Sequence, residues 1–303
     1  LLDNHPNLFV LPGDSHFIKK FSHVKPDDFQ ESVSYWLKRI INPTGQAPYF
    51  PYGRAEEKYR KFINYIFYYY QFRKQNFWDA LITALIAAFA PPENKISYWV
   101  EKTPQNEVRI SEILSRYPQA KFIHMLREPA ANINSLKKHG KYRNKTKHYL
   151  RYSFYLKHLS ETALSNQKKY GSAKYRIIHF EELVKSPESI MPVVSDFLNI
   201  QYNDTLMQPT INGIPASANS MHKASRTSGK INKEILNPNR FSELSGKEKK
   251  WIAYTFANIS TKIGYPEWNT KNKSRHKIFL RLPLWLFYRM YRTLIKTKER
   301  FYL

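Results

Sequence analysis

Four short runs of apolar residues recur along the chain, and longer stretches with helical periodicity separate them. The runs cover residues 7–11, 97–100, 121–126 and 175–180. Each run is continuous rather than alternating, which is the pattern of a strand that is buried on both faces. The helical patterns lie at about 26–40, 55–90, 104–117, 129–139, 144–170 and 187–198. Strands that alternate with helices predict an α/β fold, with a parallel sheet covered by helices on both faces.

Three further stretches do not follow this alternation. Residues 80–90 are uncharged and apolar but much shorter than the roughly 20 residues that a bilayer-spanning helix needs, so we expect a buried core helix. Aromatic side chains crowd residues 61–77, and we expect them to pack inside the protein, with stacking on sugars or bases as the alternative. Residues 208–240 carry turn-forming residues throughout, which predicts a long loop.

The last part of the chain differs in composition from the rest. Residues 271–303 hold ten Lys or Arg side chains and one Glu, around an apolar run at 278–287. Basic residues mixed with Trp, Phe and Leu are typical of a helix that lies in a membrane interface. A tail helix that packs on the domain is the alternative. We therefore expect one domain at 1–270 and a basic amphipathic tail at 271–303.

The whole chain carries a large positive charge. Its 303 residues include 49 Lys and Arg against 24 Asp and Glu, which gives a net charge of +25. Such a charge favours anionic partners, such as nucleotides, sulfated or phosphorylated substrates, nucleic acid or acidic membranes, unless it serves only solubility. The absence of Cys excludes disulfides, thiolate catalysis and Cys-ligated metal centres. The His residues are scattered without the spacing of metal ligands, so we expect no metal site.

Candidate chemistry follows the third apolar run, where a ligand of a parallel sheet is expected. Arg127 comes directly after the run, and Pro129 is suited to the first turn of a helix. A guanidinium beside the exposed N–H groups of a helix N-terminus is a site for an anion, best suited to phosphate. Ser135 lies about two turns further on and can donate another hydrogen bond. The alternative is that Arg127 only forms a salt bridge with Glu128.

The first and second runs are also followed by polar side chains. Asp14 and His16 come after the first run, and a carboxylate or an imidazole near cations can take a proton from a hydroxyl group. The alternative for Asp14 is a turn residue. Lys102 comes after the second run, where Pro104 is expected to open a helix and create a second anion site.

These motifs, in this order, resemble the sulfotransferases that use 3′-phosphoadenosine 5′-phosphosulfate (PAPS). The resemblance is carried by residues 99–104, 117–122 and 126–129 together with Ser135, and by the Phe-Glu-Glu-Leu sequence that begins at Phe180. It implies a P-loop-like α/β fold. In that family, an Arg and the Ser eight residues later hold the 3′-phosphate, which implies this role for Arg127 and Ser135.

The resemblance implies further nucleotide contacts in the second half of the chain. Phe180 stands where the family has the Tyr of a Tyr-Glu-Asp-Leu motif, so the ring is kept and the hydroxyl is not. Ser220 and Arg226 lie in a segment similar to the loop that follows this core in bacterial and carbohydrate sulfotransferases. The family's loop for the 5′-phosphosulfate has no counterpart here, and we expect it upstream of Leu1.

The implied reaction is transfer of a sulfuryl group from PAPS to an acceptor hydroxyl, with adenosine 3′,5′-bisphosphate as product. Asp14 would be the base, with His16 as the second candidate, and Lys102 would neutralise charge on the leaving side. The His-bearing strand end and the carbohydrate-type loop favour a glycan or glycolipid acceptor. A protein tyrosine, a small phenol or a lipid is the alternative. We expect a cytoplasmic enzyme at the membrane surface, with a Golgi-type lumenal enzyme as the alternative.

Two other classes of function remain open at this point. A non-enzymatic protein that binds nucleic acid or membrane surfaces would explain the charge and the tail, but not the motifs at the strand ends. A P-loop nucleotide kinase would need a GxxxxGK[ST] motif, and residues 1–303 do not contain one.

Overall fold

The structure is a computed structural model, and it divides the chain into two compact units. It describes residues 1–11, 18, 29–30, 33, 56–138, 148–216, 229–237, 241 and 243–268. The first unit is built from Leu1–Arg109 and Glu188–Asn232, and the second from Ile110–Pro187 and Lys233–Leu303. Each unit therefore contains two separate stretches of the sequence.

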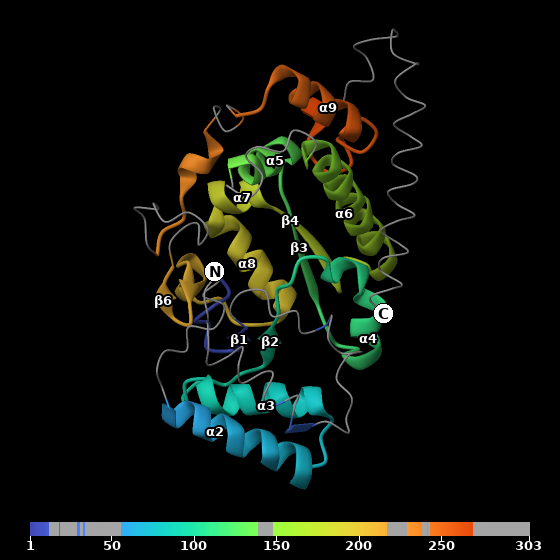
Figure 1. The fold of residues 1–303 in the computed structure, drawn as a ribbon. Helices are drawn as coiled ribbons and strands as arrows, with labels where there is room; N and C mark the ends of the chain where they lie inside the picture. Colours follow the sequence, from blue (N-terminus) through green and yellow to red (C-terminus); the bar gives the residue numbers. More distant parts are fainter. Residues whose placement is uncertain are drawn as a thin grey trace. The chain divides into compact units, whose positions relative to one another are not determined.

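The second unit is centred on two neighbouring parallel strands. Strands β3 (Phe122–Leu126) and β4 (Tyr175–His179) pair in a register that runs from Phe122 opposite Tyr175 to Leu126 opposite His179. The helices of this unit are α4 (Ile110–Arg116), α5 (Pro129–Lys138), α6 (His148–Tyr170), α7 (Phe180–Lys185), α9 (Gly246–Phe256) and the 3-10 turns η5 (Lys233–Leu236) and η7 (Pro266–Trp268). Figure 1 shows α5 and α9 at one end of the strand pair, while α6 runs alongside it.

The core of the second unit joins early and late parts of the chain. Leu126, Ala130 and Ile133, from β3 and α5, pack with Ile252 and Phe256 of α9, and all five are at most 5% exposed. This burial removes apolar surface from water and is the main stabilising term for the arrangement. The same core includes residues that follow α9 in the sequence: Ile259, Ile263 and Tyr265.

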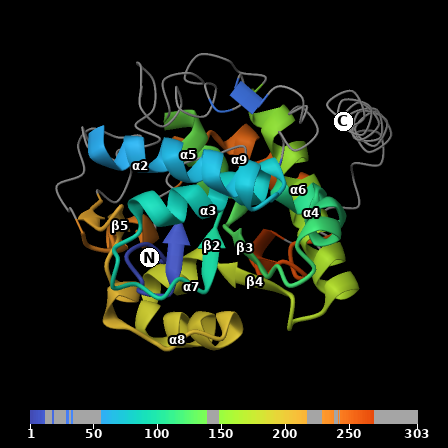
Figure 2. The ribbon, with the colours of Figure 1, turned by 90° about the horizontal axis from the view of Figure 1, so that it is seen from below.

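The first unit contains a second parallel strand pair and a helical hairpin. Strands β1 (Leu8–Val10) and β2 (Tyr98–Val100) pair from Leu8 opposite Tyr98 to Val10 opposite Val100. Helix α2 (Glu56–Phe67) continues into the π-helical turn η2 (Tyr68–Phe72) and packs alongside α3 (Phe77–Phe89), as both views show (Figure 1, Figure 2). The remaining elements are η3 (Asn106–Val108), α8 (Pro187–Leu198), η4 (Asp204–Met207), β5 (Thr210–Ile211) and β6 (Ile214–Pro215).

The helical hairpin accounts for both apolar stretches noted above. Residues 80–90 lie almost entirely in α3, whose side chains are largely buried. Among the aromatic residues of 61–77, Phe62 and Phe77 are buried as expected, whereas Tyr68 and Phe72 are 45% and 75% exposed. Within the described ranges, no helix combines the length and the apolar composition needed to cross a membrane.

The described residues confirm the four predicted strands and the parallel pairing of each pair, and they correct two helical predictions and one strand boundary. The pattern at 55–90 is interrupted by η2 and by Lys74, whose φ is +54°. The pattern at 104–117 yields a helix only from Ile110, because Gln105 has a φ of +79° and leaves the helical conformation. The strand expected at 175–180 ends at His179, and Phe180 begins α7 instead. Most of the pattern at 26–40 lies outside the described residues.

The predicted loop at 208–240 contains a short hairpin. Strands β5 and β6 pair antiparallel, and the turn between them consists of Asn212 and Gly213, with φ values of +52° and +74°. These are the positive φ values that a two-residue hairpin turn requires. The amide of Gly213 donates a hydrogen bond to the Asp3 carboxylate at 2.9 Å, which ties the turn to the first residues of the chain.

Candidate active site

The ends of β3 and β4 bring together two of the predicted nucleotide-binding residues. Leu126 lies opposite His179 where the two strands end. Arg127 and Phe180 directly follow these residues, so they are also neighbours. The guanidinium carbon of Arg127 lies 4.8 Å from the centroid of the Phe180 ring. A guanidinium at this distance over an aromatic face is held by a cation–π interaction, which orients its donors without using them.

Helix α5 begins two residues after Arg127, as predicted. Pro129 is its first residue, and the amide of Asn132 donates to the carbonyl of Glu128 at 2.9 Å, which closes the first helical turn. The first amides of a helix have no acceptor within the helix and attract an anion. Ser135 is half-buried in α5, about 9 Å along the helix axis from Pro129. Arg127, the start of α5 and Ser135 thus belong to one strand–helix junction.

A half-buried carboxylate contacts both strand ends. Glu181, in the first turn of α7, accepts a hydrogen bond from the Glu128 amide at 3.2 Å through Oε1. Its Oε2 accepts from the Tyr265 hydroxyl at 2.6 Å, and that hydroxyl also lies 3.4 Å from the carbonyl oxygen of Leu126. Burial, and next the nearby Glu181 carboxylate, raise the pKa of Tyr265 well above its usual range. The hydroxyl therefore stays protonated and acts as a donor.

Residues 263–268, which include Tyr265, form two further hydrogen bonds with residues at the strand ends. The Nε2–H group of His179 donates to the Ile263 carbonyl at 3.0 Å. Gly264 has a φ of +82°, and a Cβ atom there would lie 2.6 Å from His179 Nε2, so the close approach needs glycine. Trp268 Nε1 donates to the Glu128 carboxylate at 3.2 Å. The sequence patterns predicted no role for Tyr265, Trp268 or Glu181.

Lys102 lies in the first unit, and its local setting differs from the prediction. It is exposed, one residue from a buried Thr103. The Glu101 carboxylate accepts hydrogen bonds from the Thr103 hydroxyl and the Asn106 amide group, which fold the chain into a turn. The predicted helix N-terminus beside Lys102 is therefore wrong, because the chain forms this turn and η3 before α4 begins at Ile110. A catalytic role for Lys102 itself stays a prediction.

The other predicted site residues lie outside the part of the chain that the structure describes. These are Asp14, His16, Ser220 and Arg226, together with the whole tail at 271–303. Among the described residues, no group of three or more His, Asp or Glu side chains could hold a metal ion.

Comparison with known proteins assigns the fold and the family. A family model described as "Sulfotransferase family" matches residues 2–204. A comparison with curated proteins found no match.

Two solved structures are similar to this chain. One is a sulfotransferase domain from the curacin biosynthetic pathway, which is 16% identical over 84% of this chain and 89% of that chain, with a TM-score of 0.51. The other is a sulfotransferase domain from the Synechococcus PCC 7002 olefin synthase, which is 17% identical over 84% of this chain and 86% of that chain, with a TM-score of 0.46. The first of these likenesses supports the α/β fold predicted from the sequence.

Proposed function

Because this chain belongs to the sulfotransferase family, we propose that it transfers a sulfuryl group from PAPS to a hydroxyl group of a glycan or glycolipid. One observation carries the choice of donor. Arg127 is oriented over the Phe180 ring at the start of α5, which is an arrangement suited to a phosphate group. A 3′-phosphate is the feature that distinguishes PAPS from ordinary adenine nucleotides.

In this proposal, Arg127 and Ser135 bind the 3′-phosphate, and the ring of Phe180 orients the guanidinium by the cation–π interaction. The fork of the guanidinium can bond two phosphate oxygens at once, and the first amides of α5 add partial positive charge. Ser220 and Arg226 are proposed as further contacts to the nucleotide. None of these roles calls for a metal ion.

The proposed chemical step is an in-line displacement at sulfur. The acceptor oxygen forms a bond to sulfur while the bond from sulfur to the bridging oxygen of PAPS breaks, and adenosine 3′,5′-bisphosphate leaves. Asp14, or His16 in its place, takes the proton of the acceptor hydroxyl. Lys102 offsets the negative charge that develops on the leaving oxygen. Positioning and electrostatic stabilisation supply most of the rate enhancement in this kind of group transfer.

The acceptor and the location of the enzyme belong to the same proposal. The His16-bearing strand end and the carbohydrate-type loop favour a glycan or glycolipid hydroxyl over a tyrosine or a small phenol. The basic and apolar tail at 271–303 would hold the enzyme at an anionic membrane surface, next to lipid-linked acceptors.

Transfer and nucleotide binding test the proposal together. Labelled PAPS is incubated with desulfated polysaccharides, phenols and tyrosyl peptides, and we expect label in the polysaccharides.

Calorimetry should show that Arg127→Ala weakens the binding of adenosine 3′,5′-bisphosphate by about 2–4 kcal/mol, because one partner of a desolvated charge pair is removed. The exposed Arg116, at the end of α4, gives the matched control Arg116→Ala, which should bind as the wild type does. Equal affinities of the wild type for 5′-AMP and the bisphosphate would contradict the site, and turnover restricted to phenols would reject the glycan acceptor.

A further inference from the structure

We infer that Glu181 and Tyr265 are positioning residues, which hold the ends of β3 and β4 together so that Arg127 and Phe180 form a single binding surface. The inference rests on the proposed nucleotide site. It adds that the geometry of this site depends on the segment around Tyr265, which lies more than a hundred residues after Arg127. Neither side chain needs to touch the nucleotide for this role. We call the hydrogen bonds of the Glu181 carboxylate to Glu128 and Tyr265 the Glu181 bridge.

The Glu181 bridge lies one residue beyond the contact that it is inferred to hold. Glu128 directly follows Arg127, and Glu181 directly follows Phe180. The hydrogen bond from the Glu128 amide to Glu181 Oε1, at 3.2 Å, therefore continues the pairing of β3 and β4 after both strands have ended. Without it, the backbone on the C-terminal side of Arg127 would lose a hydrogen bond to the element that carries Phe180.

Tyr265 completes the bridge from the C-terminal segment. Its side chain is 7% exposed, and its hydroxyl lies 2.6 Å from Glu181 Oε2 and 3.4 Å from the Leu126 carbonyl oxygen. One hydroxyl thus contacts the last residue of β3 and the first turn of α7. A hydrogen bond from a neutral donor to a carboxylate is stronger than one between neutral groups, so the bridge is suited to fixing a geometry.

One further contact fixes the residue that follows Arg127. The Glu128 side chain is 1% exposed, and its carboxylate accepts from Trp268 Nε1 at 3.2 Å. Residues Leu126 and Glu128, which flank Arg127, are therefore both contacted by residues 265–268. Arg127 has a long and flexible side chain, so fixing the backbone on both sides reduces the freedom that is lost when the guanidinium binds an anion.

The inference predicts a selective loss of affinity. Adenosine 3′,5′-bisphosphate carries the phosphate assigned to Arg127, whereas 5′-AMP lacks it. In Glu181→Ala and in Tyr265→Phe, we expect affinity for the bisphosphate to fall roughly tenfold, and affinity for 5′-AMP to change by less than about twofold. In Glu181→Gln, the amide oxygen can still accept from the Glu128 N–H group, so part of the affinity should return. Calorimetry with the full chain measures both nucleotides.

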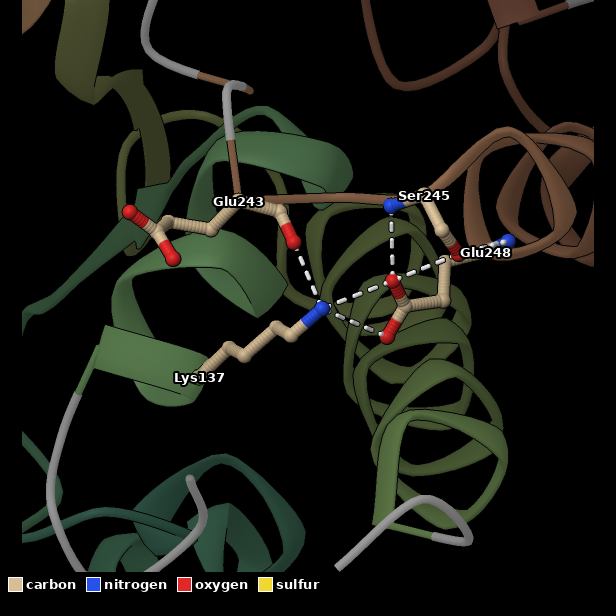
Figure 3. A network of polar contacts seen from close by, with 4 residues as sticks. All are labelled: Lys137, Glu243, Ser245 and Glu248. Carbon is tan, nitrogen blue, oxygen red and sulfur yellow. Dashed lines mark hydrogen bonds and ion pairs between the residues drawn. The ribbon is translucent and has the colours of Figure 1, made fainter. Parts of the chain in front are cut away.

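Glu248 supplies a matched control in the same unit. Its carboxylate also accepts from a backbone amide and a hydroxyl, in this case Ser245 N and Ser245 Oγ, both at 2.8 Å (Figure 3). It lies in α9, and its partners in Figure 3 are Lys137 and Ser245. Glu248→Ala should lower the melting temperature while leaving the ratio of the two nucleotide affinities as in the wild type.

The outcomes separate this inference from the proposed function. A wild-type protein that binds both nucleotides equally overturns the 3′-phosphate site, and the inference falls with it. A wild-type protein that prefers the bisphosphate, with the same preference in Tyr265→Phe and Glu181→Ala, overturns the inference alone and leaves the two residues as stabilising contacts. Three results together support the inference. The preference for the bisphosphate falls in Tyr265→Phe and Glu181→Ala, it recovers in part in Glu181→Gln, and it is unchanged in Glu248→Ala.

Discussion

His124 is an imidazole placed in the middle of a strand of the second unit. It lies in β3 and stacks against Tyr175 of β4, with ring centroids 6.2 Å apart and an angle of 27° between the planes. Burial lowers its pKa to about 4. The ring is therefore neutral at pH 7 in the folded protein, and it is suited to packing rather than to proton transfer.

This burial makes the stability of the protein sensitive to mild acid. The unfolded chain has a His pKa of about 6.5, so between about pH 6.5 and pH 4 it binds more protons at this position than the folded chain does. The free energy of unfolding should fall by up to about 3 kcal/mol as the pH drops through this range. Urea unfolding of the wild type and of His124→Gln at pH 7.5 and pH 4.5 measures the effect. The variant should lose less stability than the wild type, and an equal loss in both would count against this account.

The residues of the candidate site could be predicted only in part. Arg127 and Phe180 follow parallel strands directly, so their neighbourhood can be inferred once the strands are known. The contact between Glu181 and Tyr265 joins residues 84 positions apart, and nothing in a Tyr after a Gly indicates which carboxylate it meets. Such a contact depends on how distant parts of the chain pack together, and it cannot be predicted from the residues next to Tyr265 in the sequence.

At the scale of elements, helices α5 and α9 are joined by a charged contact. Lys137, near the end of α5, places Nζ 2.9 Å from Glu248 Oε2 and 2.5 Å from the Glu243 carbonyl oxygen (Figure 3). Ser245 and Glu248 form a capping box that begins α9. Burial acts to raise the pKa of Glu248, but hydrogen bonds from Lys137 and Ser245 outweigh it and leave the pKa below its ordinary value.

Removing the Lys137 amine should therefore destabilise the junction of these helices. In Lys137→Met, the free energy of unfolding at pH 7 should fall by about 1–2 kcal/mol, because the buried Glu248 carboxylate loses its charged donor. This stabilisation exists where Glu248 is ionised and disappears as the pH falls through its lowered pKa. The difference between variant and wild type should thus shrink in denaturant titrations as the pH is lowered below the ordinary range of a Glu side chain. Lys168→Met, which changes an exposed lysine of α6, serves as the comparison and should show no difference at either pH.

The elements themselves were predicted with uneven success. The four strands and the helix at 187–198 coincide with β1 to β4 and α8 within one residue at every boundary, because continuous apolar runs and a helix-opening Pro187 are local signals. Gln105 and Lys74 interrupt predicted helices with positive φ values of +79° and +54°. Neither residue type favours that conformation, so the sequence contains no sign of these breaks.

At the scale of the whole molecule, the charge of +25 and the tail lead to a prediction about membranes. Each Lys or Arg near an anionic surface contributes about 1 kcal/mol, and residues 271–303 combine ten of them with an apolar run. The protein should sediment with vesicles that contain phosphatidylglycerol and should bind these vesicles less at high salt. It should not bind vesicles of phosphatidylcholine alone.

Deletion of 271–303 should abolish this binding while the remaining chain keeps its melting temperature. A full-length variant that carries Trp285→Ala and Phe287→Ala gives an independent measurement, because it keeps every charge and removes only apolar side chains. If the deletion unfolds the protein, or if vesicle binding persists without the tail, these residues pack on the domain and the membrane proposal is wrong.

The division of the chain between the two units bears on which fragments of it can fold. The backbone passes from one unit to the other three times, after Arg109, after Pro187 and after Asn232. The region that matches the family model, residues 2–204, stops before the third crossing. A fragment with those limits would retain Leu126 and Ile133 but lack every α9 residue that covers them. The region that matches the family model thus ends before the residues that must be synthesised for the second unit to close its core.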